Sequence, residues 1–175
     1  MILVISTCKY GLSEEEFVRP IAEIVEKAGF RYEIKRYKEK IDPKKYDKAI
    51  ICGTALKDFE YLENMERFEW IHEFEGHILG ICAGYQVIAS LFGQKLERAE
   101  RIGVYEVEVL KENPLAEKTF RAFFLHKLAL KSAECVEPLA VQGDVICMFW
   151  IRKFYGVSFH PEVLNPEIVE RFLKI

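Results

Sequence analysis

Two short stretches of the chain carry residues whose types and spacing could do chemistry. Residues 80–84 read Gly-Ile-Cys-Ala-Gly directly after an apolar run of strand length, and residues 156–162 read Gly-Val-Ser-Phe-His-Pro-Glu. A cysteine flanked by glycines at this spacing is typical of a nucleophile held on a tight turn from a strand into a helix. In the second stretch the proline favours an extended backbone, so that His160 and Glu162 point to the same side.

Cys82 is the predicted nucleophile of the first stretch. Side chains at positions 80 and 84 would collide in such a turn, and glycine removes both collisions. The helix that follows points its N-terminal amides at Cys82, which favours a thiolate and leaves the Ala83 N–H free to stabilise an oxyanion. The alternative is a small buried cysteine without chemistry, which is the usual role of a cysteine that lacks such flanking glycines.

His160 is the predicted base, and Glu162 is predicted to orient it. A carboxylate beside an imidazole selects its tautomer and stabilises the imidazolium, which is what a cysteine nucleophile requires of its base. Taken alone, the His-Pro-Glu pattern is also explained by a surface turn, because an Asn-Pro helix start follows closely at Asn165.

The periodicity of the first half predicts the elements that position these residues. Strands are expected at 1–7, 31–37, 49–52 and 77–81, with a helix around 62–74 before the last of them. Strands alternating with helices predict an α/β fold: a doubly wound, mostly parallel, flavodoxin-like sheet flanked by helices, in which functional groups gather at the carboxyl ends of the strands.

The helix boundaries are less clear from the pattern. Ser13 and Glu16 form a capping-box pattern for a helix that stops at Gly29. Pro20 either kinks that helix or marks the first turn of a shorter one, and the sequence leaves both open. Asn165 as N-cap, with a proline in the first helical position, predicts a last helix that ends at Lys174.

The second half changes character. After Gly93, short and partly antiparallel strands are predicted at 104–110, 122–125, 138–141, 145–151 and 155–159, added to the parallel core. Residues 1–175 are interpreted as one domain, because 175 residues of which 50% are hydrophobic can build one sizeable core.

Composition narrows the classes of partner. With a net charge of -3 and 25 Lys and Arg spread along the chain, there is no basic field for nucleic acid. No apolar run approaches transmembrane length, so no membrane partner is expected. The five cysteines have no CxxC spacing and are odd in number, which indicates neither a zinc site nor a disulfide framework and favours a cytoplasmic location.

The two stretches together resemble the class I, triad-type glutamine amidotransferases. Cys82 stands in Gly-Ile-Cys-Ala-Gly-Tyr-Gln, Phe-His-Pro-Glu follows near the C-terminus, and the resemblance spans nearly the whole chain. It implies that Cys82 attacks the side-chain amide of L-glutamine to form a γ-glutamyl thioester and release ammonia. His160, oriented by Glu162, would move the protons. The resemblance implies no cofactor and no metal.

Further site residues follow from the resemblance. The oxyanion would be held by the Ala83 N–H and by an N–H of the loop at Gly53 and Thr54. Gln86 matches a position whose side chain helps to hold the substrate; a polar residue on the helix surface is the alternative. His126 belongs to the segment that best matches a substrate-contacting Ser-His-x-Asp motif, and it could equally be a surface or core residue.

The resemblance also implies a partner, a separately encoded synthetase that docks at the active-site edge and accepts the ammonia. Three departures from the family pattern, at 53–55, Ser158 and 125–128, motivate a second hypothesis, hydrolysis of a γ-glutamyl or peptide amide without ammonia transfer. A third hypothesis is a non-catalytic regulatory subunit of the same fold. The complete set of Cys82, His160 and Glu162 argues against the third.

Overall fold

One mixed sheet of nine strands runs through the protein, which a computed structural model describes over residues 1–175. The strand order is β2-β1-β3-β4-β9-β8-β7-β5-β6. The first five strands in this order are parallel: β2 (Tyr32–Arg36), β1 (Ile2–Ser6), β3 (Lys48–Ile51), β4 (His77–Ile81) and β9 (Phe154–Val157). The other four are antiparallel to their neighbours: β8 (Val145–Ile151), β7 (Glu137–Gln142), β5 (Glu97–Val109) and β6 (Phe120–Ala129).

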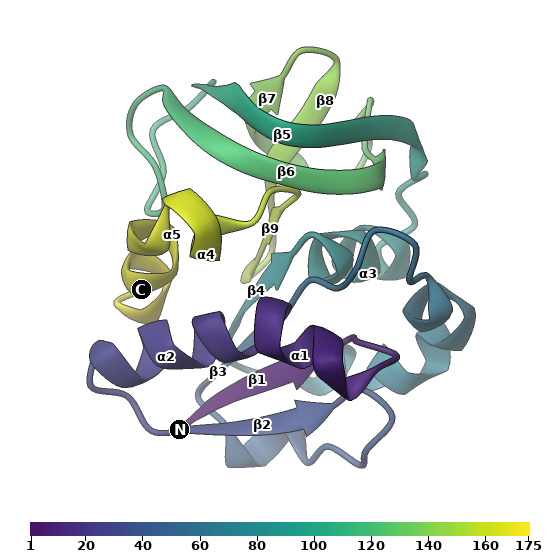
Figure 1. The fold of residues 1–175 in the computed structure, drawn as a ribbon, viewed down its shortest axis with the longest axis vertical. Coiled ribbons are helices and arrows are strands. Elements are labelled where there is room, and N and C mark those ends of the chain that lie inside the picture. The colour runs from purple at the N-terminus through teal and green to yellow at the C-terminus, as the bar shows by residue number, and fades with distance from the viewer.

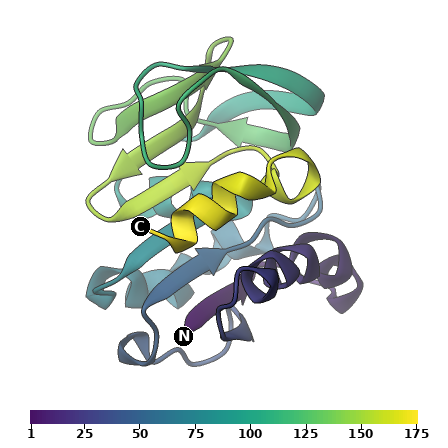
Figure 2. The same cartoon turned by 90° about the vertical axis from the view of Figure 1, so that its left-hand side faces the viewer.

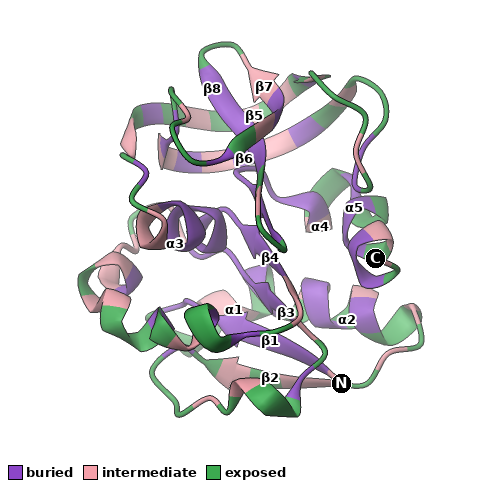
Figure 3. Ribbon diagram, turned by 180° about the vertical axis from the view of Figure 1, so that it is seen from behind, coloured by how far each residue is buried: buried purple, intermediate pink, exposed green.

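Helices cover both faces of the parallel part (Figure 1). One face carries α1 (Gly11–Phe17), α2 (Arg19–Lys27), α4 (Pro161–Leu164) and α5 (Pro166–Leu173). Figure 3 shows α3 (Ala83–Leu91) on the opposite face, where the 3₁₀ segment η2 (Glu60–Glu73) packs against it. A short 3₁₀ turn, η1 (Pro43–Lys45), precedes β3. The predicted fold class, an α/β protein with a mostly parallel core and added antiparallel strands, is confirmed.

Burial follows from this layering. All five residues of β1 are buried, and so are four of the five in β4, because helices cover both faces of these strands (Figure 3). Strand β5 instead alternates between exposed residues and half-buried or buried ones, since one of its faces is open to solvent. None of the helices has the length and apolar character needed to cross a membrane.

The β5–β6 ribbon is longer than the sequence predicted. The expected strands at 104–110 and 122–125 are parts of strands of 13 and 10 residues, which curve across one end of the molecule (Figures 1 and 2). Antiparallel pairing from Glu97↔Ala129 to Val107↔Phe120 continues β5 through charged residues that no local pattern marks as a strand. A register shift between Arg98 and Arg101 interrupts the ladder.

The capping box predicted at Ser13 is wrong. Helix α1 begins at Gly11, and the Ser13 N–H donates to the Tyr10 carbonyl at 3.1 Å as part of the first turn. The structure also decides the role of Pro20. Helix α1 ends at Phe17 and α2 begins at Arg19, so the proline stands in the first turn of a separate, shorter helix, where its missing N–H costs nothing.

Two further helix predictions need correction. The helix expected around 62–74 is a 3₁₀ segment interrupted at Asn64, whose φ of -126° and ψ of 41° are not helical. Asn165 does precede α5, but its side chain makes no capping hydrogen bond. Its amide donates instead to the Arg121 carbonyl of β6 at 3.1 Å, which ties the C-terminal helix to the edge strand.

Candidate active site

The carboxyl ends of three neighbouring strands meet at the candidate site. Strands β3, β4 and β9 are parallel neighbours, and Gly53, Cys82 and His160 each follow one of them within three residues. A Cβ placed on Gly53 would lie 2.6 Å from Cε1 of His160 and 3.3 Å from Cβ of Cys82. The structure therefore packs the nucleophile and base predicted from the sequence against one glycine, which leaves no space for a side chain there.

Cys82 occupies a strained turn between β4 and α3. Its φ of 48° and ψ of -93° lie in a region that residues other than glycine rarely adopt. A Cβ on Gly80 would collide with the Gly84 carbonyl, as expected for a turn this tight. A Cβ on Gly84 would collide with the carbonyl of Ile51 in β3, so the second glycine is required by the neighbouring strand.

Backbone N–H groups near Cys82 are available to an oxyanion. The first helical bond of α3 runs from the Gln86 N–H to the Cys82 carbonyl at 3.1 Å, which leaves the Ala83 N–H outside the helical ladder. Across from it, the N–H groups of Gly53 and Thr54 donate to no main-chain carbonyl. These N–H groups are the donors that the sequence analysis assigned to the oxyanion, and that assignment stays a prediction.

His160 and Glu162 form a buried pair, with Nδ1 of the ring 2.7 Å from Oε1 of the carboxylate. Their side chains are 1% and 3% exposed. The local structure differs from the extended segment that the sequence predicted. Pro161 begins helix α4, and Glu162 reaches back to the ring from the first turn of that helix. The juxtaposition is as expected, but a helix start produces it.

Charge near His160 decides its protonation. Burial disfavours the imidazolium, but the charges of Cys82 and Glu162 outweigh it and raise the pKa of His160 to about 10. Nε2 of the ring has no hydrogen-bond partner, and the Cys82 thiol is directed to the Leu125 carbonyl at 3.4 Å. The His160 ring is therefore an imidazolium at neutral pH, and its Nε2 has no hydrogen-bond partner.

His126 has the opposite environment. It lies in β6, lines the pocket at Cys82 and is 2% exposed, with no hydrogen bond to either ring nitrogen. Burial lowers the pKa of His126 to about 4, and the charges of Arg101 and His160 lower it further. The nearby Ala99 carbonyl acts in the opposite direction and raises this pKa, although it makes no hydrogen bond to the ring. His126 is thus a neutral polar group in the wall of the site.

Gln86 also lines the pocket, but both ends of its amide bond to the protein. Oε1 accepts from the Tyr61 hydroxyl at 2.5 Å, and Nε2 donates to the Leu128 carbonyl at 2.9 Å. At 2% exposure, Gln86 is not the helix-surface residue of the alternative interpretation. Tyr61 was not predicted as part of the site, and no local signal marks it, because its partner Gln86 lies 25 residues further along the chain.

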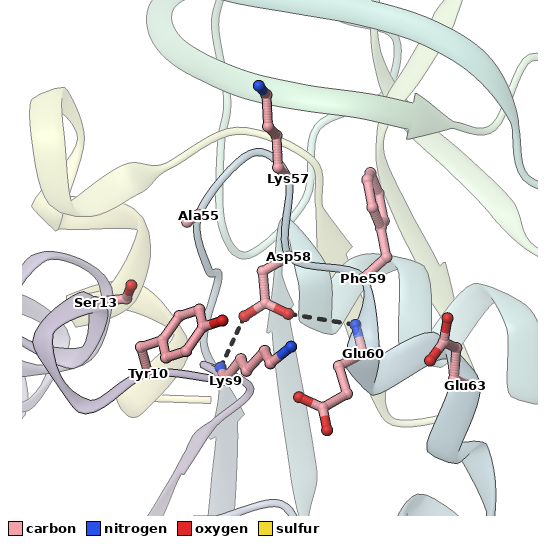
Figure 4. Close-up of a pocket in the computed structure, with 9 residues that line it drawn as sticks. All are labelled: Lys9, Tyr10, Ser13, Ala55, Lys57, Asp58, Phe59, Glu60 and Glu63. Carbon is pink, nitrogen blue, oxygen red and sulfur yellow. Dashed lines mark hydrogen bonds between the residues drawn. The ribbon is translucent and has the colours of Figure 1, made fainter.

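The space at Cys82 is narrow and is bounded by the loop at 54–59. The cavity measures about 10 Å³, roughly the room of one water molecule. Asp58 fixes the loop, because its carboxylate accepts from the Thr54 hydroxyl at 2.8 Å. It also accepts from the Lys9 N–H at 2.8 Å and from the Glu60 N–H at 3.3 Å (Figure 4). A space of this size has no room for an amino acid.

A larger cavity of about 520 Å³ lies on the other side of the loop (Figure 4). Phe59 lines both this cavity and the narrow one at Cys82. Ala55 and Asp58 line both cavities as well.

The sequence is similar to those of known proteins. The family model "Glutamine amidotransferase class-I" matches residues 13–174. The chain belongs to the class I glutamine amidotransferases. Among curated relatives, a subunit of the glutamine-hydrolyzing GMP synthase of Pyrococcus furiosus is 32% identical over 136 residues, which cover 70% of this chain and 71% of that one. Anthranilate synthase component 2 of Saccharolobus solfataricus is 26% identical over 151 residues, covering 77% and 75%.

The fold of this amidotransferase also matches solved structures. A putative GMP synthase subunit from Thermoplasma acidophilum superposes with a TM-score of 0.84 at 21% identity, covering 99% of this chain and 92% of that one. At this identity the match supports the fold, and the site residues rest on the geometry described above.

Proposed function

We propose that this chain is a glutaminase subunit that hydrolyses L-glutamine to glutamate and ammonia, with Cys82, His160 and Glu162 as its catalytic residues. The observation that carries the proposal is the convergence of three strand ends, which packs Cys82 and the His160–Glu162 pair around Gly53. Membership of the class I family supports the choice of glutamine as the substrate.

The proposed reaction has two steps. The Cys82 thiolate attacks the amide carbon, the oxyanion is held by the N–H groups of Ala83 and the Gly53–Thr54 loop, and the C–N bond breaks as His160 donates its proton to the leaving ammonia. The resulting γ-glutamyl thioester is then attacked by water, whose proton passes to His160. The C–S bond breaks, glutamate leaves and the thiolate returns. Glu162 keeps the ring oriented throughout.

We further propose that the ammonia passes to a separately encoded synthetase, and that the chain works in the cytoplasm. A GMP synthase partner is favoured, because the P. furiosus relative is a GMP synthase subunit and matches over most of both chains. The anthranilate synthase component keeps a second acceptor open. Closure of the site around Cys82 supports a partner that opens the loop at 54–59 on docking.

Ammonia release from L-glutamine by the purified chain tests the proposal, beside a Cys82→Ala control and with a diazoketone analogue of L-glutamine that labels the thiol. We expect release or labelling that disappears in the control. Turnover of γ-glutamyl peptides in preference to glutamine would favour amide hydrolysis without ammonia transfer. A chain that shows no release and no labelling, alone or with the co-purified synthetase, would be a non-catalytic subunit.

A further inference from the structure

The two ends of the nine-stranded sheet differ in what covers their outer edges. At one end the carbonyls of β6 accept hydrogen bonds from the Asn165 side chain, the His160 N–H and the Gln86 side chain. At the opposite end of the sheet β2 is the last strand, and no strand lies beyond it (Figure 1). The edge of β2 is therefore open to a strand of another chain.

The backbone groups of β2 alternate between β1 and this open edge. The Tyr37 N–H donates back to the end of β1 at 3.0 Å. Because successive residues of a strand turn their N–H and C=O groups to opposite sides, the odd-numbered residues of β2 bond to β1, and Tyr32 and Ile34 face outward. At the next outward position, the Arg36 N–H donates to Oε2 of Glu39 at 2.7 Å, and the Arg36 carbonyl accepts from the Glu39 N–H at 2.9 Å. The open edge ends there.

The sequence of β2, Tyr-Glu-Ile-Lys-Arg, is complementary to itself when two copies pair antiparallel. With a two-fold axis at Ile34, Glu33 of each copy lies directly opposite Lys35 of the other. The two Ile34 side chains, 44% exposed in the single chain, then contact each other, and their outward N–H and C=O groups form two hydrogen bonds. Tyr32 lies opposite Arg36, whose carbonyl oxygen has a second lone pair for the Tyr32 N–H.

Charge selects this register over its neighbours. An axis at Glu33 would place that carboxylate directly opposite its own copy, and an axis at Lys35 would do the same with the ammonium. Like charges directly opposite each other destabilise a strand pair. A lysine on an edge strand usually keeps other chains away, but with the axis at Ile34 each ammonium meets a carboxylate.

Lys35 and Glu33 are only loosely paired within one chain. Nζ of Lys35 lies 3.8 Å from Oε1 of Glu33 and 3.9 Å from Oε1 of Glu39, and its one hydrogen bond, to the Lys40 carbonyl, is long at 3.5 Å. Oε2 of Glu33 accepts from Lys45 at 2.7 Å, which leaves Oε1 without a hydrogen bond. A second copy would bring each of these groups a closer partner of opposite charge.

We propose that β2 pairs antiparallel with β2 of a second copy of this chain, about a two-fold axis at Ile34, and so forms a homodimer with one sheet continuous through both chains. This inference does not depend on the glutaminase function. Because the pairing is antiparallel, the carboxyl ends of β3, β4 and β9 in the two copies face opposite directions. Both Cys82 sites therefore stay open, and each copy can bind its own synthetase.

Sedimentation analysis of the purified chain, at concentrations from about 1 μM to 1 mM, tests the dimer. We expect the mass to rise with concentration from the 20.5 kDa of one chain toward twice that value. Ile34→Pro removes the outward N–H and leaves the ladder to β1 intact, so it should raise the dissociation constant at least about tenfold. A wild-type chain that stays monomeric over the whole range overturns the proposal.

Two charge variants test the register. Glu33→Lys gives each copy two cations across the axis, and Lys35→Glu gives each copy two carboxylates, so either variant alone should dissociate roughly tenfold more readily than the wild type. An equimolar mixture of the two variants should form a mixed dimer about as stable as the wild-type one, because every cation again faces a carboxylate. Damage within a single chain would not be repaired by mixing.

Matched controls make the same charge changes elsewhere. Glu112 and Lys118 are exposed in the loop between β5 and β6, so Glu112→Lys and Lys118→Glu should leave the dissociation constant unchanged. Thermal melting in dilute solution shows whether each variant is folded. A dimer that no β2 variant weakens uses another surface, and the proposal is then wrong. It is equally wrong if the β2 variants weaken binding to the synthetase alone, because the open edge then takes that partner.

Discussion

Two buried histidines stand on either side of the Cys82 site, and their environments differ. His160 has a carboxylate at 2.7 Å and a thiol nearby, and its pKa is raised to about 10. His126 has no hydrogen-bond partner on either nitrogen, and its pKa is lowered to about 4. Both are at least 98% buried. Burial alone would make both rings neutral, so the neighbouring charges determine which one can serve as an acid.

The largest difference should appear in catalysis. His160→Asn removes the group that protonates the leaving ammonia, so we expect kcat to fall on the order of 10³-fold. His126→Asn keeps a neutral polar side chain in the wall, and its kcat should fall less than about tenfold. Steady-state ammonia release measures both. An equal loss in the two variants would contradict the division of roles, and melting temperatures would show whether either variant fails to fold.

The second difference should appear in stability at acid pH. The pKa of His126 falls from 6.5 in the unfolded chain to about 4 in the native one, so between these values only the unfolded chain binds the proton. The free energy of unfolding should therefore decrease as pH falls from 6.5 to 4, by about 3 kcal/mol from this residue. Urea titrations at several pH values measure it.

The pKa of His160 lies above its unfolded value, so its contribution has the opposite sign. It is fully present below pH 6.5 and is lost as pH rises through about 10. His126→Leu should flatten the acid decrease and leave the alkaline one, while the control His72→Gln, at a partly exposed site, should change neither. Burial also lowers the pKa of His77, so some acid decrease will remain in His126→Leu, and a decrease of unchanged size would refute the assignment.

The smallest expected effect comes from moving His160 without removing it. A Cβ at position 53 would lie 2.6 Å from the His160 ring, so Gly53→Ala must displace the ring or the loop. A misplacement of about 1 Å costs on the order of 100-fold in rate, and we expect a fall of that size in kcat. Gly11→Ala is the control, because its Cβ meets only the end of the Arg36 side chain at 3.1 Å. Wild-type kcat in Gly53→Ala would show that the contact is unimportant.

The sequence predicted the parts of this site that depend on local pattern. The glycines at 80 and 84 mark the turn that holds Cys82, and the parallel strands are recognisable as apolar runs because both of their faces are buried. The adjacency of Cys82 and His160 followed from the rule that strand ends meet at one edge, together with the family resemblance.

Features that depend on contacts distant in sequence were not predictable in this way. Separate segments must meet before three of these features arise: the Tyr61–Gln86 hydrogen bond, the hydrogen bonds to the Asp58 carboxylate, and the lack of any partner for His126. Strand β5 was underestimated for the same reason, because its partner β6 extends it through residues 97–101. The predicted capping box at Ser13 was wrong because the Ser13 N–H donates to the Tyr10 carbonyl inside the first turn of α1, so Ser13 does not precede the helix.

Phe59 lines three cavities: the narrow one at Cys82, one of about 500 Å³ beside Arg98 and Lys127, and the one beside Lys9 and Lys57. A single substitution at this position would therefore alter the walls of all three cavities at once.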